Sequence, residues 1–132
     1  MKPFNQFLSV SLFAIVMAMP VFAAEPVDPD IRKAAGRYDL WEDYEGGTVC
    51  TINLTTKRTI GGYVIDGKED CFARLALDGD PFAWFLTDAG DVVIIDATRK
   101  RLVTLEHHKD REYYAVRQNE GRANLNLTPP TP

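Results

Sequence analysis

The chain has 132 residues, of which 26% are charged, and its formal net charge is −4, so its length suits one compact domain. It has 15 Lys and Arg against 19 Asp and Glu, which excludes the dense basic face of a typical nucleic-acid-binding protein. We find no polybasic run or amphipathic helix that would indicate attachment to or insertion into a membrane.

The first 23 residues have the pattern of a secretory signal peptide. Lys2 supplies the positive charge, and an apolar run follows at residues 7–19, shorter than the roughly 20 residues that span a membrane. The small residues Val21 and Ala23 predict cleavage after Ala23, with cleavage after Ala24 as the alternative. The junction has no cysteine for a lipid anchor. We therefore expect an exported, soluble periplasmic protein of 109 residues that begins at Ala24 and, without Lys2, has a net charge of −5.

A polar lead-in, residues 24–35, comes next and lacks the apolar periodicity of a helix or a strand. Its prolines, Pro26 and Pro29, favour extended backbone at themselves and at the residues before them. A stiffened segment loses less conformational entropy when it enters the cleft of a partner. The sequence therefore predicts an extended N-terminal trunk. The alternative is an ordinary disordered terminus ahead of a short helical turn at residues 31–35.

From Gly36 onward, short apolar segments alternate with residues that form turns. Cys50, Ile52 and Leu54 fall on one face of their segment, as Leu125 and Leu127 do on theirs, which is typical of antiparallel sheets with one buried face. The predicted strands are residues 37–41, 48–54, 59–65, 82–87, 91–96, 101–107, 112–117 and 123–128.

Eight strands with short connections predict an all-β fold, a small antiparallel up-and-down barrel over residues 36–128, because closure removes both sheet edges. A two-sheet sandwich is the alternative. The one longer connection, residues 71–81, has mixed apolar spacing, which predicts a helical turn that plugs one end of the barrel. The final residues, 129–132, are expected to form a disordered tail.

The interior of this barrel is expected to be filled. An eight-stranded barrel is just wide enough for side chains, and the predicted inward-pointing residues are bulky, namely Ile52, Leu54, Trp84 and Leu105. A ligand-binding barrel is therefore the weaker alternative. Trp41, Tyr44, Tyr113 and Tyr114 are explained as well by packing as by a ligand mouth.

The two cysteines, Cys50 and Cys71, predict a disulfide, because an even pair in an exported chain forms one more often than it forms a metal or redox site. A disulfide that closes the loop between these two cysteines would stabilise the protein by roughly 3 kcal/mol. His107 and His108 are neighbours on a strand and so point to opposite faces, which disfavours a shared metal ion. With no catalytic triad or phosphate-binding loop either, we expect neither an enzyme nor a cofactor.

Thirteen residues form an ordered pattern along the chain, namely Gly36, Tyr38, Leu40, Cys50, Leu54, Gly62, Tyr63, Cys71, Leu75, Trp84, Gly90, Asp96 and Leu105. This pattern resembles that of the AprI/Inh family, periplasmic inhibitors of secreted bacterial zinc metalloproteases of the serralysin type. The resemblance covers roughly residues 34–116 and implies a lipocalin-like barrel of eight strands with one disulfide. One departure is Tyr38, where the family usually has Trp.

The resemblance also implies a mechanism. In the family, an N-terminal trunk enters the protease cleft and its α-amine approaches the catalytic zinc. By position, Ala24 offers this amine, Glu25, Pro26 and Val27 occupy the substrate subsites, and Asp28 completes the inhibitory trunk. An α-amine has a pKa of about 7.7–8.0, so a useful neutral fraction can take the open position of a catalytic zinc.

The partner expected from the resemblance is a secreted serralysin-type zinc metalloprotease, which a monomeric inhibitor would block. Two alternatives stay open. The protein could inhibit another class of hydrolase through a loop at the barrel rim, such as residues 78–82, or it could bind a small ligand.

Overall fold

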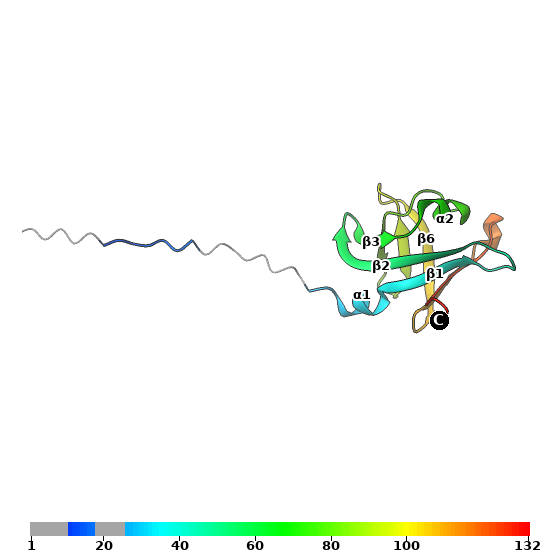
Figure 1. The fold of residues 1–132 in the computed structure, drawn as a ribbon, viewed down its shortest axis with the longest axis horizontal. Helices are drawn as coiled ribbons and strands as arrows, with labels where there is room; N and C mark the ends of the chain where they lie inside the picture. Colours follow the sequence, from blue (N-terminus) through cyan, green and yellow to red (C-terminus); the bar gives the residue numbers. More distant parts are fainter. Residues whose placement is uncertain (1–10, 18–25) are drawn as a thin grey trace, which may run out of the picture.

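The computed structural model describes residues 11–17 and 26–132 (Figure 1). The predicted cleavage site and two residues of the predicted trunk, Ala24 and Glu25, lie outside the described residues. Within the described residues, no helix combines the length and the apolar character needed to cross a membrane.

Eight antiparallel strands form a closed barrel in which each strand pairs with the next along the chain and β8 pairs with β1. The prediction of an eight-stranded up-and-down barrel is confirmed, and the sandwich is wrong. The strands are β1 (Gly36–Glu42), β2 (Val49–Thr59), β3 (Gly62–Asp66), β4 (Ala83–Leu86), β5 (Val92–Ile95), β6 (Arg101–Lys109), β7 (Glu112–Ala115) and β8 (Leu125–Thr128).

The largest difference from the predicted strand boundaries lies at the end of β2. Residues 55–58 were expected to form a turn, but they continue β2, and the chain reverses at Ile60 and Gly61 instead. Gly61 has φ +85°, a backbone conformation that glycine adopts without strain. The polar residues before it fit a strand because their side chains face solvent, and Thr55 Oγ1 donates to the Val64 carbonyl across the pair at 2.7 Å.

The barrel interior is packed with side chains, as predicted. Leu54, Trp84 and Leu105 have no exposed surface, and Ile52 has 2%. The indole of Trp84 satisfies its one donor inside the wall, where Nε1 lies 3.0 Å from the Thr55 carbonyl oxygen. The interior of the barrel therefore serves as the hydrophobic core.

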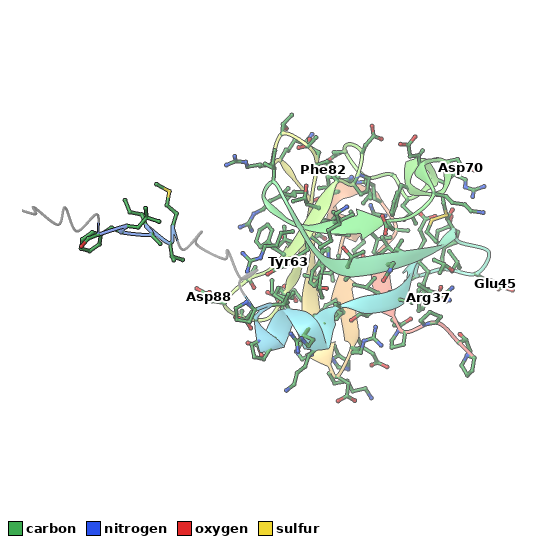
Figure 2. The ribbon with its side chains drawn as sticks, turned by 60° about the vertical axis from the view of Figure 1, so that its left-hand side comes forward. Arg37, Glu45, Tyr63, Asp70, Phe82 and Asp88 are labelled. Atoms are coloured by element: carbon green, nitrogen blue, oxygen red, sulfur yellow. A yellow bond between two sulfur atoms is a disulfide. The ribbon has the colours of Figure 1, made fainter. Side chains whose placement is uncertain are left out.

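Different segments of the chain cover the two ends of the barrel. Figure 2 shows Glu45 and Asp70 at one end and Asp88 at the other. At the first, the disulfide end, the Cys50–Cys71 disulfide joins the start of β2 to helix α2 (Glu69–Arg74). This confirms the predicted disulfide. The predicted helical turn is also present, although it begins at Glu69 and ends at Arg74.

Buried side chains hold the chain at the disulfide end. Phe72 of α2 is 5% exposed, and Leu75 after it is fully buried. Arg117 is also buried, and its Nη1 donates to the carbonyl oxygen of Leu75 at 3.0 Å. Burial lowers the pKa of Arg117. Between β7 and β8 lies a 3-10 turn, η1 (Gln118–Glu120).

The other end, the trunk end, has helix α1 (Pro29–Ala34) just before β1. The turns between β2 and β3, between β4 and β5, and between β6 and β7 lie at this same end, because the strands alternate in direction. At the C-terminus, residues 129–132 have no helix or strand.

Candidate functional site

The lead-in becomes helical at its second proline. Asp28 has an extended backbone, and its Oδ1 accepts a hydrogen bond from the Asp30 N–H at 2.8 Å, so Asp28 is the N-cap. Pro29 occupies the first helical position, where its missing N–H costs nothing. The expectation of an extended backbone through residue 35 is therefore wrong for Pro29–Ala34. The short helical turn that was the alternative is present instead.

Helix α1 is anchored to the barrel rather than merely preceding it. Ile31 and Ala34, spaced three residues apart on one helix face, are 8% and 4% exposed and belong to the main core. The hydroxyl of Tyr38 in β1 donates to the Ala34 carbonyl oxygen. That hydroxyl in turn accepts a hydrogen bond of 3.1 Å from Arg111 Nε. The barrel therefore fixes where the helix lies.

Arg111, in the turn between β6 and β7, closes this anchor. Its Cζ lies 4.4 Å from the centre of the Tyr38 ring, and its Nη2 donates to the Arg37 carbonyl oxygen at 3.1 Å. A Cβ on Gly36, whose φ is +135°, would come within 2.6 Å of this guanidinium. The backbone conformation therefore favours glycine at position 36, and a side chain there would displace the Arg111 guanidinium from the anchor.

The anchor uses both capacities of the Tyr38 hydroxyl. A tyrosine hydroxyl can donate and accept at once, whereas an indole can only donate. Tyr38 also packs edge-on against Tyr113, with ring centres 6.2 Å apart. Burial, followed by the proximity of Tyr38, raises the pKa of Tyr113 to about 12.

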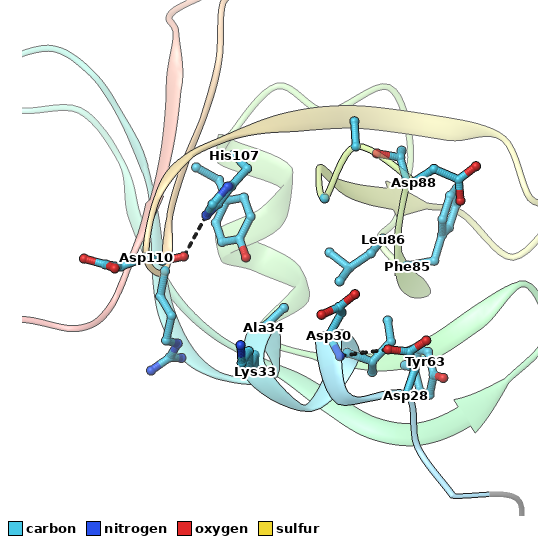
Figure 3. A pocket seen from close by; sticks show the side chains of 16 residues that line it. Asp28, Asp30, Lys33, Ala34, Tyr63, Phe85, Leu86, Asp88, His107 and Asp110 are labelled. Atoms are coloured by element: carbon cyan, nitrogen blue, oxygen red, sulfur yellow. Dashed lines mark hydrogen bonds between the residues drawn. The ribbon is translucent and has the colours of Figure 1, made fainter.

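A surface cleft of about 1080 Å³ lies beside α1, between the helix and the turn that joins β4 to β5 (Figure 3). Leu86 and Asp88 line it across from the helix, and Asp28, Asp30 and Tyr63 line it at the start of the helix. The helix and this turn together form the rim of the barrel at the trunk end.

The structure describes three of the five predicted trunk residues. Pro26 is exposed, Val27 is half-buried against the core, and Asp28 caps α1. The rim loop proposed as the alternative active surface, residues 78–82, lies at the disulfide end, which is the opposite end of the barrel from α1. There Asp78 Oδ1 lies 3.3 Å from Arg122 Nη1.

The histidine pair does not form a common site. The Nε2 of His107 lies 2.8 Å from the carbonyl oxygen of Asp110, while the His108 ring packs edge-on against Tyr114. Among the described residues, no group of three or more His, Cys, Asp and Glu side chains is arranged to hold a metal ion.

Sequence reasoning missed the anchor itself. The signals for α1 were present, because Asp28 followed by Pro29 is a helix start and Ile31 and Ala34 have helical spacing. Arg111 had no such signal. It lies 73 residues from Tyr38 in the sequence, and only the closure of the barrel brings the two together.

The interior of the small barrel is filled with side chains, and helix α1 is anchored at its rim. Comparison with protein families matches residues 29–127 to the family described as protease inhibitor Inh. The match covers well over half of the chain, so the protein belongs to the Inh family of protease inhibitors. The family assignment makes it an inhibitor and not an enzyme.

The fold is similar to that in a crystal structure of a psychrophilic marine protease MP inhibitor. The TM-score is 0.61 at 19% sequence identity, over 76% of this chain and 99% of that chain. At this identity the likeness concerns the fold. A comparison with curated proteins gives no match.

Proposed function

We propose that this protein inhibits a secreted zinc metalloprotease of the serralysin type in the periplasm, with its N-terminal trunk in the active-site cleft. The observation that carries the proposal is the anchoring of α1 at the trunk end, where Tyr38 bonds to the Ala34 carbonyl and Ile31 lies in the core. Cleavage after Ala23 leaves Ala24 to Asp28 as a short segment ahead of a fixed helix.

The length of this segment limits where the zinc can lie. Ala24 is four residues before Asp28, and each extended residue spans at most about 3.5 Å, so the α-amine reaches about 14 Å beyond the N-cap. A protease that places its zinc within this distance must also contact the rim of the barrel. We expect that contact to involve α1 and the turn at residues 87–91.

Each trunk residue then has a role that its chemistry supports. The neutral α-amine of Ala24 replaces the zinc-bound water, since a catalytic zinc keeps one position open. Glu25, Pro26 and Val27 occupy the subsites, and Pro26 arrives with φ already fixed. The Asp28 cap and Pro29 hold the base of the segment, so that less entropy is lost on binding.

The test is an inhibition titration against a serralysin-type protease. Protein that begins at Ala24 is compared with the same protein carrying one additional N-terminal residue, and a protein with one additional residue after Pro132 is the matched control. We expect tight inhibition by the first and third proteins and a loss of at least about a hundredfold in the second, because the donor atom moves by about 3.5 Å.

A deletion of residues 24–26 tests the trunk without disturbing its anchor. It keeps Val27 against the core and Asp28 as the N-cap, so the thermal unfolding midpoint should change little while inhibition is lost. Full inhibition by the extended or the shortened protein would refute the trunk mechanism and move the active surface to the barrel rim. Inhibition of only a serine or cysteine protease would refute the zinc target.

A further inference from the structure

The outer wall of the barrel carries a second candidate surface, which is apolar and separate from the trunk. Six large apolar side chains of the barrel domain are exposed, and four of them, Tyr44, Val49, Tyr114 and Val116, lie on or beside β1, β2, β7 and β8. Exposed apolar side chains are ordinary when scattered, but a concentration of them on one face marks an interaction surface.

The strand register shows how this face is built. Trp41 of β1 and Tyr114 of β7 both pair with Asn126 of β8, which lies between them. Neighbouring strands are about 4.8 Å apart, so the two aromatic residues are separated by about 10 Å. Their side chains point outward, because the next residues, Leu40 and Tyr113, point into the barrel.

A groove of about 530 Å³ follows β8 between these two aromatic walls. Asn126 and Thr128 line it along β8, and the Asn126 side-chain amide makes no hydrogen bond within the described part of the chain. We name this surface the β8 groove, and its lining includes Trp41, Asp43, Glu112, Tyr114, Asn126 and Thr128.

Both rings are held in place before any ligand arrives. The indole Nε1 of Trp41 donates to Thr128 Oγ1 at 3.1 Å. The His108 ring packs against Tyr114 with centres 6.3 Å apart, and a hydrogen bond to Glu106 raises the pKa of the Tyr114 hydroxyl. Rings that are fixed in this way lose little freedom on binding, which is the property of an anchor in an interface.

Two carboxylates line the groove, one at each end. Asp43 lies beyond the end of β1, Glu112 begins β7, and Glu106 pairs with Tyr114 in the register. At the trunk-end edge Lys109 pairs with Glu112, so Asp43 is the carboxylate without a cation opposite it in the register. Aromatic faces beside carboxylates attract organic cations, since the ring quadrupole and the carboxylate both favour positive charge.

We propose that the β8 groove binds a basic segment of a partner protein, with an arginine or lysine side chain seated between Trp41 and Tyr114. The aliphatic part of such a side chain packs on the two rings. Its charged group reaches the carboxylate of Asp43 or Glu112 and the side-chain carbonyl oxygen of Asn126. This inference does not rest on the proposed trunk mechanism, because the groove and the trunk share no residue.

The test uses the mature protein and an acetylated peptide of sequence Gly-Arg-Gly-Arg-Gly. The chain has two tryptophans, so NMR follows two indole N–H signals, that of Trp41 in the groove and that of the buried Trp84. We expect the peptide to shift the Trp41 signal and leave Trp84 unchanged. The shift should weaken as salt is added, because the contact is partly electrostatic.

Matched variants locate the binding. The affinity should fall about tenfold in Tyr114→Ala and in the double variant Asp43→Asn/Glu112→Gln, in line with a cation–π contact or a charged pair. It should be unchanged in Phe82→Ala, which also removes an exposed aromatic ring, and in Asp66→Asn, which removes a carboxylate at the end of β3.

Three results would overturn the inference. One is a Trp41 signal that does not move, or that moves equally with a Gly-Glu-Gly-Glu-Gly peptide. Another is a shift with the neutral sugar cellotetraose but not with the arginine peptide, which would make the groove a glycan site. The third is sedimentation that shows a dimer covering the groove, which would make a second copy of the chain its occupant.

Discussion

Replacing Tyr38 with phenylalanine removes one oxygen atom and with it the hydrogen bonds of Tyr38 to α1 and to Arg111. The Tyr38 hydroxyl is the point where the Ala34 carbonyl and the Arg111 guanidinium meet. The phenylalanine ring keeps the packing against Tyr113 and the contact under Arg111. The variant therefore tests the two hydrogen bonds and little else.

The expected loss of stability follows from the two hydrogen bonds that the substitution removes. A neutral hydrogen bond contributes about 1 kcal/mol to stability, and one with a charged partner contributes about 1.5–3 kcal/mol. Arg111 retains its bond to the Arg37 carbonyl, which offsets part of the loss. We expect Tyr38→Phe to reduce the free energy of unfolding by about 2 kcal/mol, which lowers the midpoint of a domain this size by roughly 8 °C.

Thermal and urea unfolding, followed by circular dichroism, measure this loss. Tyr44→Phe is the matched control, because Tyr44 is 57% exposed and lies outside the anchor. The Tyr38 variant should also inhibit its protease less tightly, since the base of the trunk is no longer fixed. Equal stability of the two variants would show that the Tyr38 hydroxyl does not hold α1, and the account of the anchor would fail.

Three further predictions concern other parts of the molecule. The double variant Cys50→Ser/Cys71→Ser should lose roughly 3 kcal/mol of stability in urea unfolding, and an unchanged midpoint would contradict the role of the disulfide. Asp28→Ala should cost about 1 kcal/mol by removing the cap of α1; Asp66→Ala, at an exposed strand end, is its control. The pKa of Tyr113 is raised to about 12, so folding favours its protonated form. The protonated side chain therefore contributes in full to the free energy of unfolding below pH 10, and this contribution disappears between pH 10 and 12. Tyr113→Phe should therefore lose less stability than the wild type across that interval, and a phenolate absorbance titration that shows every tyrosine ionising near pH 10 would contradict this.

The barrel could be predicted because its sequence is locally consistent. Alternating apolar residues in Val49–Thr59 and Leu125–Thr128 face one core, and glycines mark several of the turns. The boundary at residues 55–58 could not be read in this way. Thr, Lys and Arg resemble a turn in composition, yet they continue a strand whose outer face is in water.

The candidate site was less predictable for a physical reason. The lead-in was interpreted from its prolines, which favour extended backbone, although Pro29 in the first turn of a helix has the same φ. The anchor depends on contacts between residues far apart in the sequence, such as Arg111 with Tyr38. The β8 groove depends likewise on pairing of the first and last strands, which only barrel closure produces.

In the proposed complex, the start of α1 at Pro29 would also limit how far the protease can digest the inhibitor. Proteases cleave chains that lie extended in their clefts, and an extended N-terminus resembles a substrate. In the proposed complex only the residues up to Asp28 can adopt that form. To draw a later peptide bond into the cleft, the protease would have to unwind the helix and pull Ile31 and Ala34 out of the core. The helix would thus act as a stop that separates a lasting blocker from one that is digested.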